Sequence, residues 1–141
     1  MMKLSRTASY AVQAALHLAQ SKTDSPVPCS RIAADGQMPE RFLLQVLRTL
    51  VTKEILHSTR GVDGGYMLER EPGDISLLEV IEAIDGPMAA KLPPVDGLST
   101  DTKDKLIKAM DGVTAHMRRE LNAIKLTDLL ALKPKPTNGK S

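Results

Sequence analysis

Aromatic residues and cysteine are both scarce in this chain of 141 residues. It contains two tyrosines, one phenylalanine and no tryptophan, so its core must be aliphatic. Proteins that hold single-stranded nucleic acids stack the bases on aromatic side chains, and this composition disfavours that class. Cys29 is the one cysteine, which excludes an internal disulfide and any zinc or iron–sulfur site that takes several thiolates from one chain.

Long apolar runs and recognisable metal-ligand spacings are also missing. No apolar run approaches the roughly 18 residues of a membrane span, and the start MMKLSRTASY lacks the basic head and apolar body of a signal peptide. We therefore expect a cytoplasmic protein. His17, His57 and His116 are scattered along the chain, so we expect no metal. We expect Cys29 to be a small, partly buried residue, with a ligand or redox role as the alternative.

The net charge is only +2, but the charges are segregated. Residues 1–70 contain nine basic and six acidic residues, residues 71–98 contain one and six, and residues 99–141 contain nine and five. A basic first part can meet phosphates while an acidic middle is held away from them.

The first third of the chain predicts a helix-turn-helix. Apolar residues at helical spacing predict a helix over 6–20 with Ser5 as its N-cap. A short helix is expected after Ser30, with Gly36 as its left-handed stop, and Pro39 suits the first turn of the next helix. That helix has one apolar stripe, formed by Phe42, Leu43, Val46, Leu47 and Leu50.

The third predicted helix has a polar face beside this stripe. Arg41, Gln45, Arg48 and Thr52 recur every three or four residues, and Leu44 lies near the edge of their face. For an isolated helix, a solvated surface is the more common explanation. The element that follows favours a face that reads DNA.

That element is a hairpin, with strands expected over 55–58 and 65–69 and a glycine-rich turn between them. Glycines at a hairpin tip permit positive φ angles and close approach of the backbone to a neighbour. Arg60, next to Gly61, can therefore enter a narrow minor groove. An isolated hairpin of this kind would be a plain hairpin with an exposed arginine. Because this hairpin follows a helix-turn-helix, it is better explained as a DNA-binding wing.

The remaining chain predicts a capped helix, a loop and a long helix. Ser76 can cap the helix LLEVIEAID, whose expected buried stripe is Leu77, Val80, Ile81 and Ile84. Residues 87–98 are rich in proline and have no period. Residues 101–125 predict a long helix whose apolar residues repeat at close to heptad spacing. The simplest partner for so long a helix is the same helix of a second copy. The alternative is a helix that folds back on its own domain. The apolar stripe of the long helix consists of Leu106, Met110, Val113, Met117, Leu121 and Ile124.

These elements give a division of the chain. We expect a winged helix-turn-helix domain over 1–86, a loop over 87–98, a dimerisation helix with a C-terminal segment over 99–132, and a disordered tail over 133–141. The fold class is mainly α with a small β-hairpin.

Five stretches resemble the Rrf2 family of winged helix-turn-helix regulators, the group that includes IscR, NsrR and CymR. They are MKLSRTASYAV, FLLQVLRTL, TRGVDGGYML, ISLLEVIEAIDGP and AIKLTDLL. The resemblance implies a winged helix-turn-helix with a long C-terminal dimerisation helix, and a homodimer that binds double-stranded DNA at palindromic operators.

The resemblance also implies roles for single residues. Matched by position, the major-groove contacts fall on Arg41, Leu44 and Gln45, and the minor-groove contact falls on Arg60. Leu44 replaces a glutamate that is common in the group, so the operator should differ, with apolar contact to a thymine methyl as one possibility. Phosphate contacts near the N-terminus would rest on Lys3, Ser5 and Arg6.

The largest departure from the family pattern is in the loop over 87–98. Cluster-binding members place three cysteines there, and MAAKLPPVDGL has none. We therefore expect no iron–sulfur cluster held in that way and no other cofactor. The effector is not evident.

The leading hypothesis is a sequence-specific DNA-binding transcriptional regulator, expected to be a repressor and a homodimer. The alternative is a cluster-free winged-helix module that acts through a partner protein. An enzyme is disfavoured, because no nucleophile has a neighbouring base and GVDGGY lacks the strand-to-helix context of a phosphate loop.

Overall fold

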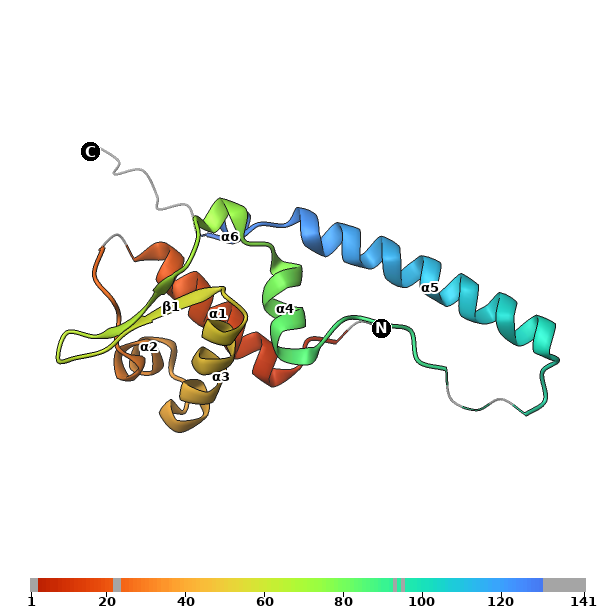
Figure 1. Ribbon diagram of the computed structural model, residues 1–141, viewed down its shortest axis with the longest axis horizontal. Coiled ribbons are helices and arrows are strands. Elements are labelled where there is room, and N and C mark those ends of the chain that lie inside the picture. Colours follow the sequence, from red (N-terminus) through yellow and green to blue (C-terminus); the bar gives the residue numbers. More distant parts are fainter. Residues whose placement is uncertain (1–2, 22–23, 93, 95, 131–141) are drawn as a thin grey trace, which may run out of the picture.

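The computed structural model describes residues 3–21, 24–92, 94 and 96–130 (Figure 1). The elements in chain order are α1 (Arg6–Gln20), α2 (Cys29–Gly36), α3 (Glu40–Thr52), β1 (Leu56–Thr59), β2 (Gly65–Leu68), the 3-10 turn η1 (Pro72–Asp74), α4 (Leu77–Asp85), α5 (Thr100–Ala123) and α6 (Leu126–Leu129). The predicted fold class, mainly α with a small β-hairpin, is confirmed. No helix in the described ranges is both long and apolar enough to cross a bilayer.

The described chain has two parts, which Figure 1 separates clearly. The head comprises the described residues of 3–86 together with 124–130. The arm is α5, which projects away from the head, while α6 returns to it and packs beside η1 and α1. The predicted tail over 133–141 lies outside the described residues.

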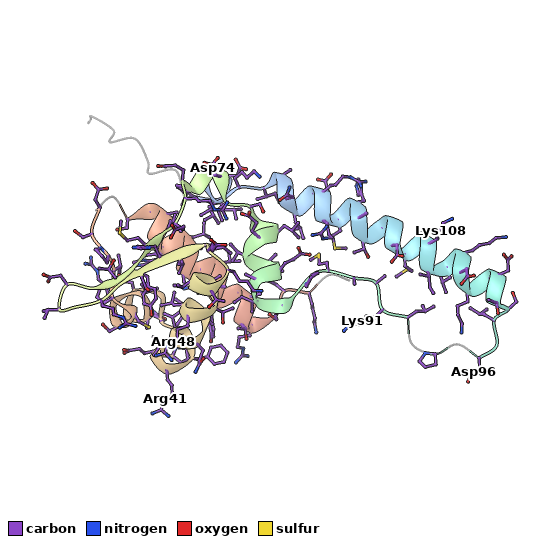
Figure 2. The ribbon with its side chains drawn as sticks, viewed as in Figure 1. Arg41, Arg48, Asp74, Lys91, Asp96 and Lys108 are labelled. Atoms are coloured by element: carbon purple, nitrogen blue, oxygen red, sulfur yellow. The ribbon has the colours of Figure 1, made fainter. Side chains whose placement is uncertain are left out.

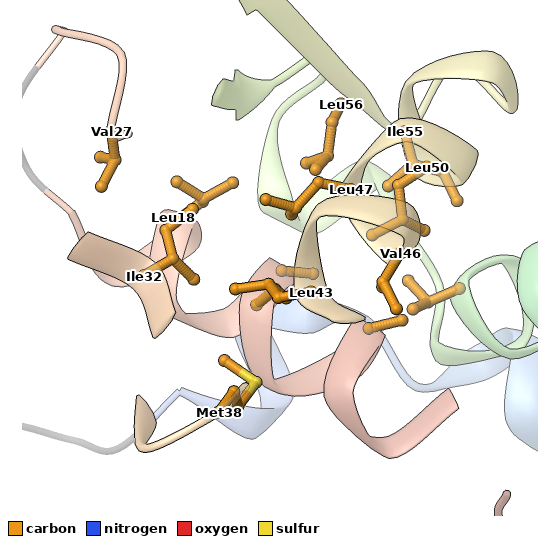
Figure 3. Packing of buried hydrophobic residues seen from close by; sticks show 14 of the residues in the cluster. Leu18, Val27, Ile32, Met38, Leu43, Val46, Leu47, Leu50, Ile55 and Leu56 are labelled. Atoms are coloured by element: carbon orange, nitrogen blue, oxygen red, sulfur yellow. The ribbon is translucent and has the colours of Figure 1, made fainter. Parts of the chain in front are cut away.

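Helix α1 lies at the centre of the head, with the bounds that the sequence predicts. Its inner face is made of alanines, since Ala8, Ala11, Ala14 and Ala15 are each fully buried. Small side chains allow α3 and α4 to approach the α1 backbone, and α1 also contacts α2, α6 and β2. The rest of the core is aliphatic, as expected, with large buried side chains from α2, α3 and the start of the hairpin (Figure 3).

The turn between α2 and α3 is built differently from the prediction. Pro28 is the N-cap of α2, so Ser30 lies in the first turn and does not cap it. The left-handed residue is Gln37, with φ 55°, and Gly36 is helical. A Cβ at Gly36 would lie 2.7 Å from Met38 Cε and 2.8 Å from Gln13 Nε2, so these two flexible side chains would have to shift to admit it.

One member of the predicted α3 stripe is not in the core. Phe42 is 43% exposed, whereas Leu43, Val46, Leu47 and Leu50 are buried. Its ring meets the ring of Tyr10 on α1 edge to face, with 5.6 Å between centroids. This pair covers the α1–α3 contact at its rim, a geometry that aromatic pairs favour.

The hairpin is antiparallel and pairs Leu56 with Leu68 and Thr59 with Gly65. A third segment joins it, because Val27 and Tyr66 exchange two backbone hydrogen bonds of 3.0 and 2.9 Å. The segment before α2 is therefore fixed to the base of the hairpin. The predicted first strand, 55–58, is shifted by one residue, since the Ile55 amide donates to the Leu50 carbonyl at the end of α3.

Ser76 caps α4 as predicted, and a capping box is complete. Its Oγ accepts from the Glu79 amide and Glu79 Oε2 accepts from the Ser76 amide, each at 3.0 Å. The predicted stripe needs one correction, because Leu78 is buried while Leu77 and Ile84 are only half-buried.

The arm ends two residues earlier than predicted, so Ile124 is not part of a helical seam. Ile124 is the extended C-cap of α5. The reason is a strand-like pairing with the segment before α4: the Leu77 amide donates to the Ile124 carbonyl at 2.8 Å, and the Leu126 amide donates to the Ile75 carbonyl at 3.0 Å. These bonds satisfy backbone groups that a continuing helix would have used internally.

The predicted stripe on α5 is divided between two environments. Leu121 is buried and, with the half-buried Met117, packs on Leu78 and Ile81 of α4, so this end of the stripe belongs to its own head. Farther along the arm Leu106 is half-buried, while Met110 is 42% and Val113 60% exposed. The packing of Met117 and Leu121 fits the alternative of a helix that folds onto its own domain, and the dimer contact expected of Met110 and Val113 stays a prediction.

Replacing Gly65 with alanine should destabilise the head. Gly65 has φ 156°, and a Cβ there would lie against the Val27 carbonyl, so the bridge from Val27 to Tyr66 has to open. We expect a loss of about 1–3 kcal/mol in the free energy of unfolding, measured by urea denaturation.

Gly97→Ala is the matched control for Gly65→Ala. A Cβ at Gly97 meets nothing within 4 Å, so we expect a change within about 0.5 kcal/mol. Equal stability of the two variants would contradict the proposed close approach at Gly65.

Candidate nucleic-acid interface

The polar face of α3 is open to a ligand. Arg41, Gln45 and Arg48 are exposed, and no carboxylate of the described residues lies within ion-pair distance of either arginine. Figure 2 shows Arg41 pointing away from the helix. The opposite face of α3 is held by Leu43, Val46, Leu47 and Leu50 in the core, so the exposed face has a fixed direction.

Leu44 and Thr52 contribute less to this face than the arginines. Leu44 is half-buried, so only part of its side chain is available for an apolar contact. The Thr52 hydroxyl donates to the Arg48 carbonyl at 3.1 Å within the helix, which leaves it as an acceptor only.

The hairpin tip presents Arg60 beside a glycine turn. Gly61 has φ 113° and its carbonyl accepts from the Gly64 amide at 3.0 Å, which closes the turn. Arg60 is exposed, and within the described chain it forms no ion pair. Val62 at the same tip is completely exposed. It was not among the residues predicted from the sequence, although an apolar residue inside a glycine-rich turn was visible there.

The N-terminal group is only partly free. Lys3 and Arg6 are exposed, but the Ser5 hydroxyl accepts from the Ala8 amide and donates to Asp85 at 2.8 and 3.0 Å from its two oxygens. The Ser5 hydroxyl has one proton, and it already donates that proton in its hydrogen bond to Asp85. The Asp85 carboxylate beside it also repels phosphate. The structure therefore removes Ser5 from the phosphate contacts and gives it a role in joining α1 to the end of α4.

Cys29 lies where α2, α3 and the hairpin meet. It is half-buried, and its Sγ donates to the Glu40 carbonyl at 3.8 Å. Burial, followed by the charge of Glu40, raises the pKa of the thiol. Burial and the nearby Cys29 raise the pKa of Tyr66, while Arg48 opposes that shift. Cys29 and Tyr66 therefore lie close to each other, with Glu40 and Arg48 of α3 near them.

Helix α3 therefore presents exposed arginine and glutamine side chains on one face. The hairpin beside it presents the exposed Arg60. A family model corresponds to this arrangement: the Rrf2 model, described as iron-dependent transcriptional regulators, matches residues 4–132. The chain belongs to the Rrf2 family.

Several relatives of this Rrf2 chain are named as transcriptional regulators. It is 38% identical over 89 residues to an HTH-type regulator of Mycobacterium tuberculosis, covering 63% of this chain and 55% of that one. It is 29% identical over 104 residues to CymR of Bacillus subtilis, covering 74% and 72%. The chain spans about half the length of the first curated relatives it matches.

Solved structures of this family share the fold. CymR of B. subtilis superposes with a TM-score of 0.73 at 24% identity, over 92% of this chain and 96% of that one. IscR of T. potens superposes with a TM-score of 0.68 at 30% identity, over 91% and 85%. The predicted winged helix-turn-helix with a long C-terminal helix is thereby confirmed.

The family description names iron, and in the part of the chain that the structure describes the side chains do not fit an iron centre. No group of three or more His, Cys, Asp and Glu side chains gathers in the described ranges. The one thiol is Cys29, and its raised pKa disfavours the thiolate that binds metals.

Proposed function

We propose that the chain is a sequence-specific DNA-binding transcriptional regulator that acts as a homodimer on a palindromic operator. The observation that carries this proposal is the free face of α3, where Arg41, Gln45 and Arg48 project from a helix whose other side is fixed in the core. A helix presented in this way fits the major groove, and side chains of these types pair with base edges.

The residues divide into those that read bases and those that position the head. In the major groove an arginine pairs with guanine and a glutamine with adenine, so Arg41, Gln45 and Arg48 are the proposed readers. The exposed part of Leu44 suits a thymine methyl. Lys3 and Arg6 are proposed to contact phosphates, which fix register without carrying sequence information.

The wing is proposed to enter the adjacent minor groove with Arg60. The positive φ of Gly61 turns the backbone sharply after this arginine, so the tip is narrow. The exposed Val62 adds an apolar surface at the tip, which suits the sugar edge of the groove. A dimer seated at a promoter in this way blocks other proteins from the same DNA, so we expect repression.

The proposed dimer forms through the arm. Ile107, Met110 and Val113 are 40%, 42% and 60% exposed on one stretch of α5. A second copy would remove this apolar surface from water.

DNA recovered from a random pool tests the proposed function. The full chain should enrich an inverted repeat, and its affinity should fall steeply as salt rises because phosphate contacts release counterions. Affinity that depends on salt alone, without enrichment of any sequence, would exclude an operator-binding function and favour action through a protein partner.

Arg60→Ala and Gln45→Ala should weaken binding in different ways. Arg60→Ala should reduce affinity for all sequences and lower the salt dependence by about one counterion per half-site. Gln45→Ala should relax base preference at one position per half-site by about 1–3 kcal/mol. Binding to operators mutated one base at a time separates these outcomes, and both variants should keep the mass of the wild-type dimer.

Met110→Glu should convert the dimer to a monomer, because it places a charge in the apolar surface of the arm. Lys108→Glu is the control: Lys108 is exposed on the opposite face of α5 and the substitution introduces the same side chain. Sedimentation equilibrium gives the mass of each. A Met110→Glu dimer as stable as the wild type would place the dimer contact elsewhere.

We also propose that this chain regulates without bound iron or an iron–sulfur cluster. The single thiol and its raised pKa support this. Protein purified without oxygen should contain well under one iron per ten chains, should lack visible absorption, and should bind its operator equally well after chelation. Stoichiometric iron that is lost together with operator binding would contradict the proposal.

A further inference from the structure

The C-terminal end of the arm is the part that packs on the head. Helix α5 packs on the head through α4, where Met117 and Leu121 meet Leu78 and Ile81. Just beyond, the backbone pairing of Ile124 with Leu77 fixes the position at which the chain re-enters the head. Apolar contact is not directional, so the packing of α5 on α4 fixes the location of the arm more firmly than its angle.

A directional contact lies beside the apolar one. Arg118 on α5 forms a fork with Glu82 on α4: its Nε donates to Oε2 at 2.9 Å and its Nη2 donates to Oε1 at 2.8 Å. The side chain of Glu82 is only 16% exposed. Two parallel charge-assisted bonds of this kind fix the relative orientation of their partners.

The same carboxylate holds a third segment. Glu82 Oε2 also accepts from the Met88 amide at 2.6 Å, at the start of the segment that leads to the arm. The Arg118 hydrogen bonds, together with the Met88 amide, hold the pKa of Glu82 below its usual range against the effect of burial. Glu82 therefore joins α4, α5 and their connection in one contact.

Small changes of angle at this contact have large effects at the far end of the arm. The arm from Thr100 to Arg118 is roughly 27 Å long at about 1.5 Å per residue. A rotation of roughly 10° moves its far end by roughly 5 Å, which exceeds the ~3.4 Å rise of one base pair. In a dimer joined by its arms, this angle sets the separation of the two recognition helices.

We infer that the Glu82–Arg118 fork is a positioning contact that determines which half-site spacing the dimer accepts. This inference rests on the proposed function. The fork does not touch DNA; it acts through the angle between arm and head, and two half-sites must lie at a defined separation along the duplex for both heads to bind.

The experiment uses the full chain and the inverted repeat that the wild type selects from random DNA. Binding is measured on a series in which the spacer between half-sites is shortened or lengthened one base pair at a time. Glu82→Gln and Arg118→Gln should each reduce the preference for the best spacer by about fivefold or more, the lower range of typical coupling between sites. Preference for bases within each half-site should stay unchanged.

Arg119→Gln is the matched control, because Arg119 is the next residue on α5, is exposed, and contacts His116 instead of Glu82. It should keep the wild-type spacing profile. Arg118→Lys retains the charge but cannot form the fork, so it should broaden the spacing profile as Arg118→Gln does. It replaces Arg118→Gln in the experiment if Arg118→Gln does not fold.

The outcomes separate this inference from the proposed function. A wild type that selects no sequence overturns both. Suppose instead that the wild type prefers one spacing. If Glu82→Gln and a folded Arg118 variant keep that preference, the positioning role alone is overturned. The same holds if Arg119→Gln loses the preference to an equal extent.

Discussion

The close packing of α1 against its neighbours is the constraint on which the rest of the structure depends. Four alanines with no exposed surface line its inner face, and they admit α3 on one side and α4 on another. A larger side chain at any of them would force these helices apart, because protein cores are as densely packed as crystals. The same helix therefore orients the polar face of α3 and supports the helix on which the arm rests.

Much of the fold follows from local pattern. The period of apolar residues predicts α1 to the residue, and Ser76 predicts the start of α4, since both signals depend only on neighbours in the chain. Errors occur where a distant partner decides the outcome. Ile124 leaves the helix because Leu77, 47 residues earlier in the chain, donates a backbone hydrogen bond to its carbonyl.

The residues of the candidate site divide in the same way, into those that neighbours in the chain determine and those that a distant partner determines. The exposed face of α3 and the wing arginine could be predicted because helical spacing and turn chemistry determine them. Ser5 could not, since its acceptor Asp85 is eighty residues away in the chain. The Glu82–Arg118 fork was missed for the same reason: nothing in the spacing of two charges on separate helices reveals that they meet.

The bridge between Val27 and Tyr66 has a consequence for how an operator is recognised. It ties the segment before α2 to the hairpin, while α3 packs on α2 and β1, so α3 and the hairpin belong to one packed unit. Under the proposed function, this connection limits how far the two contacts can move apart, so a duplex that bends or narrows would meet both more readily. Base pairs that no side chain touches would then affect affinity through their stiffness, and flexible pyrimidine–purine steps between the two contacts would be favoured.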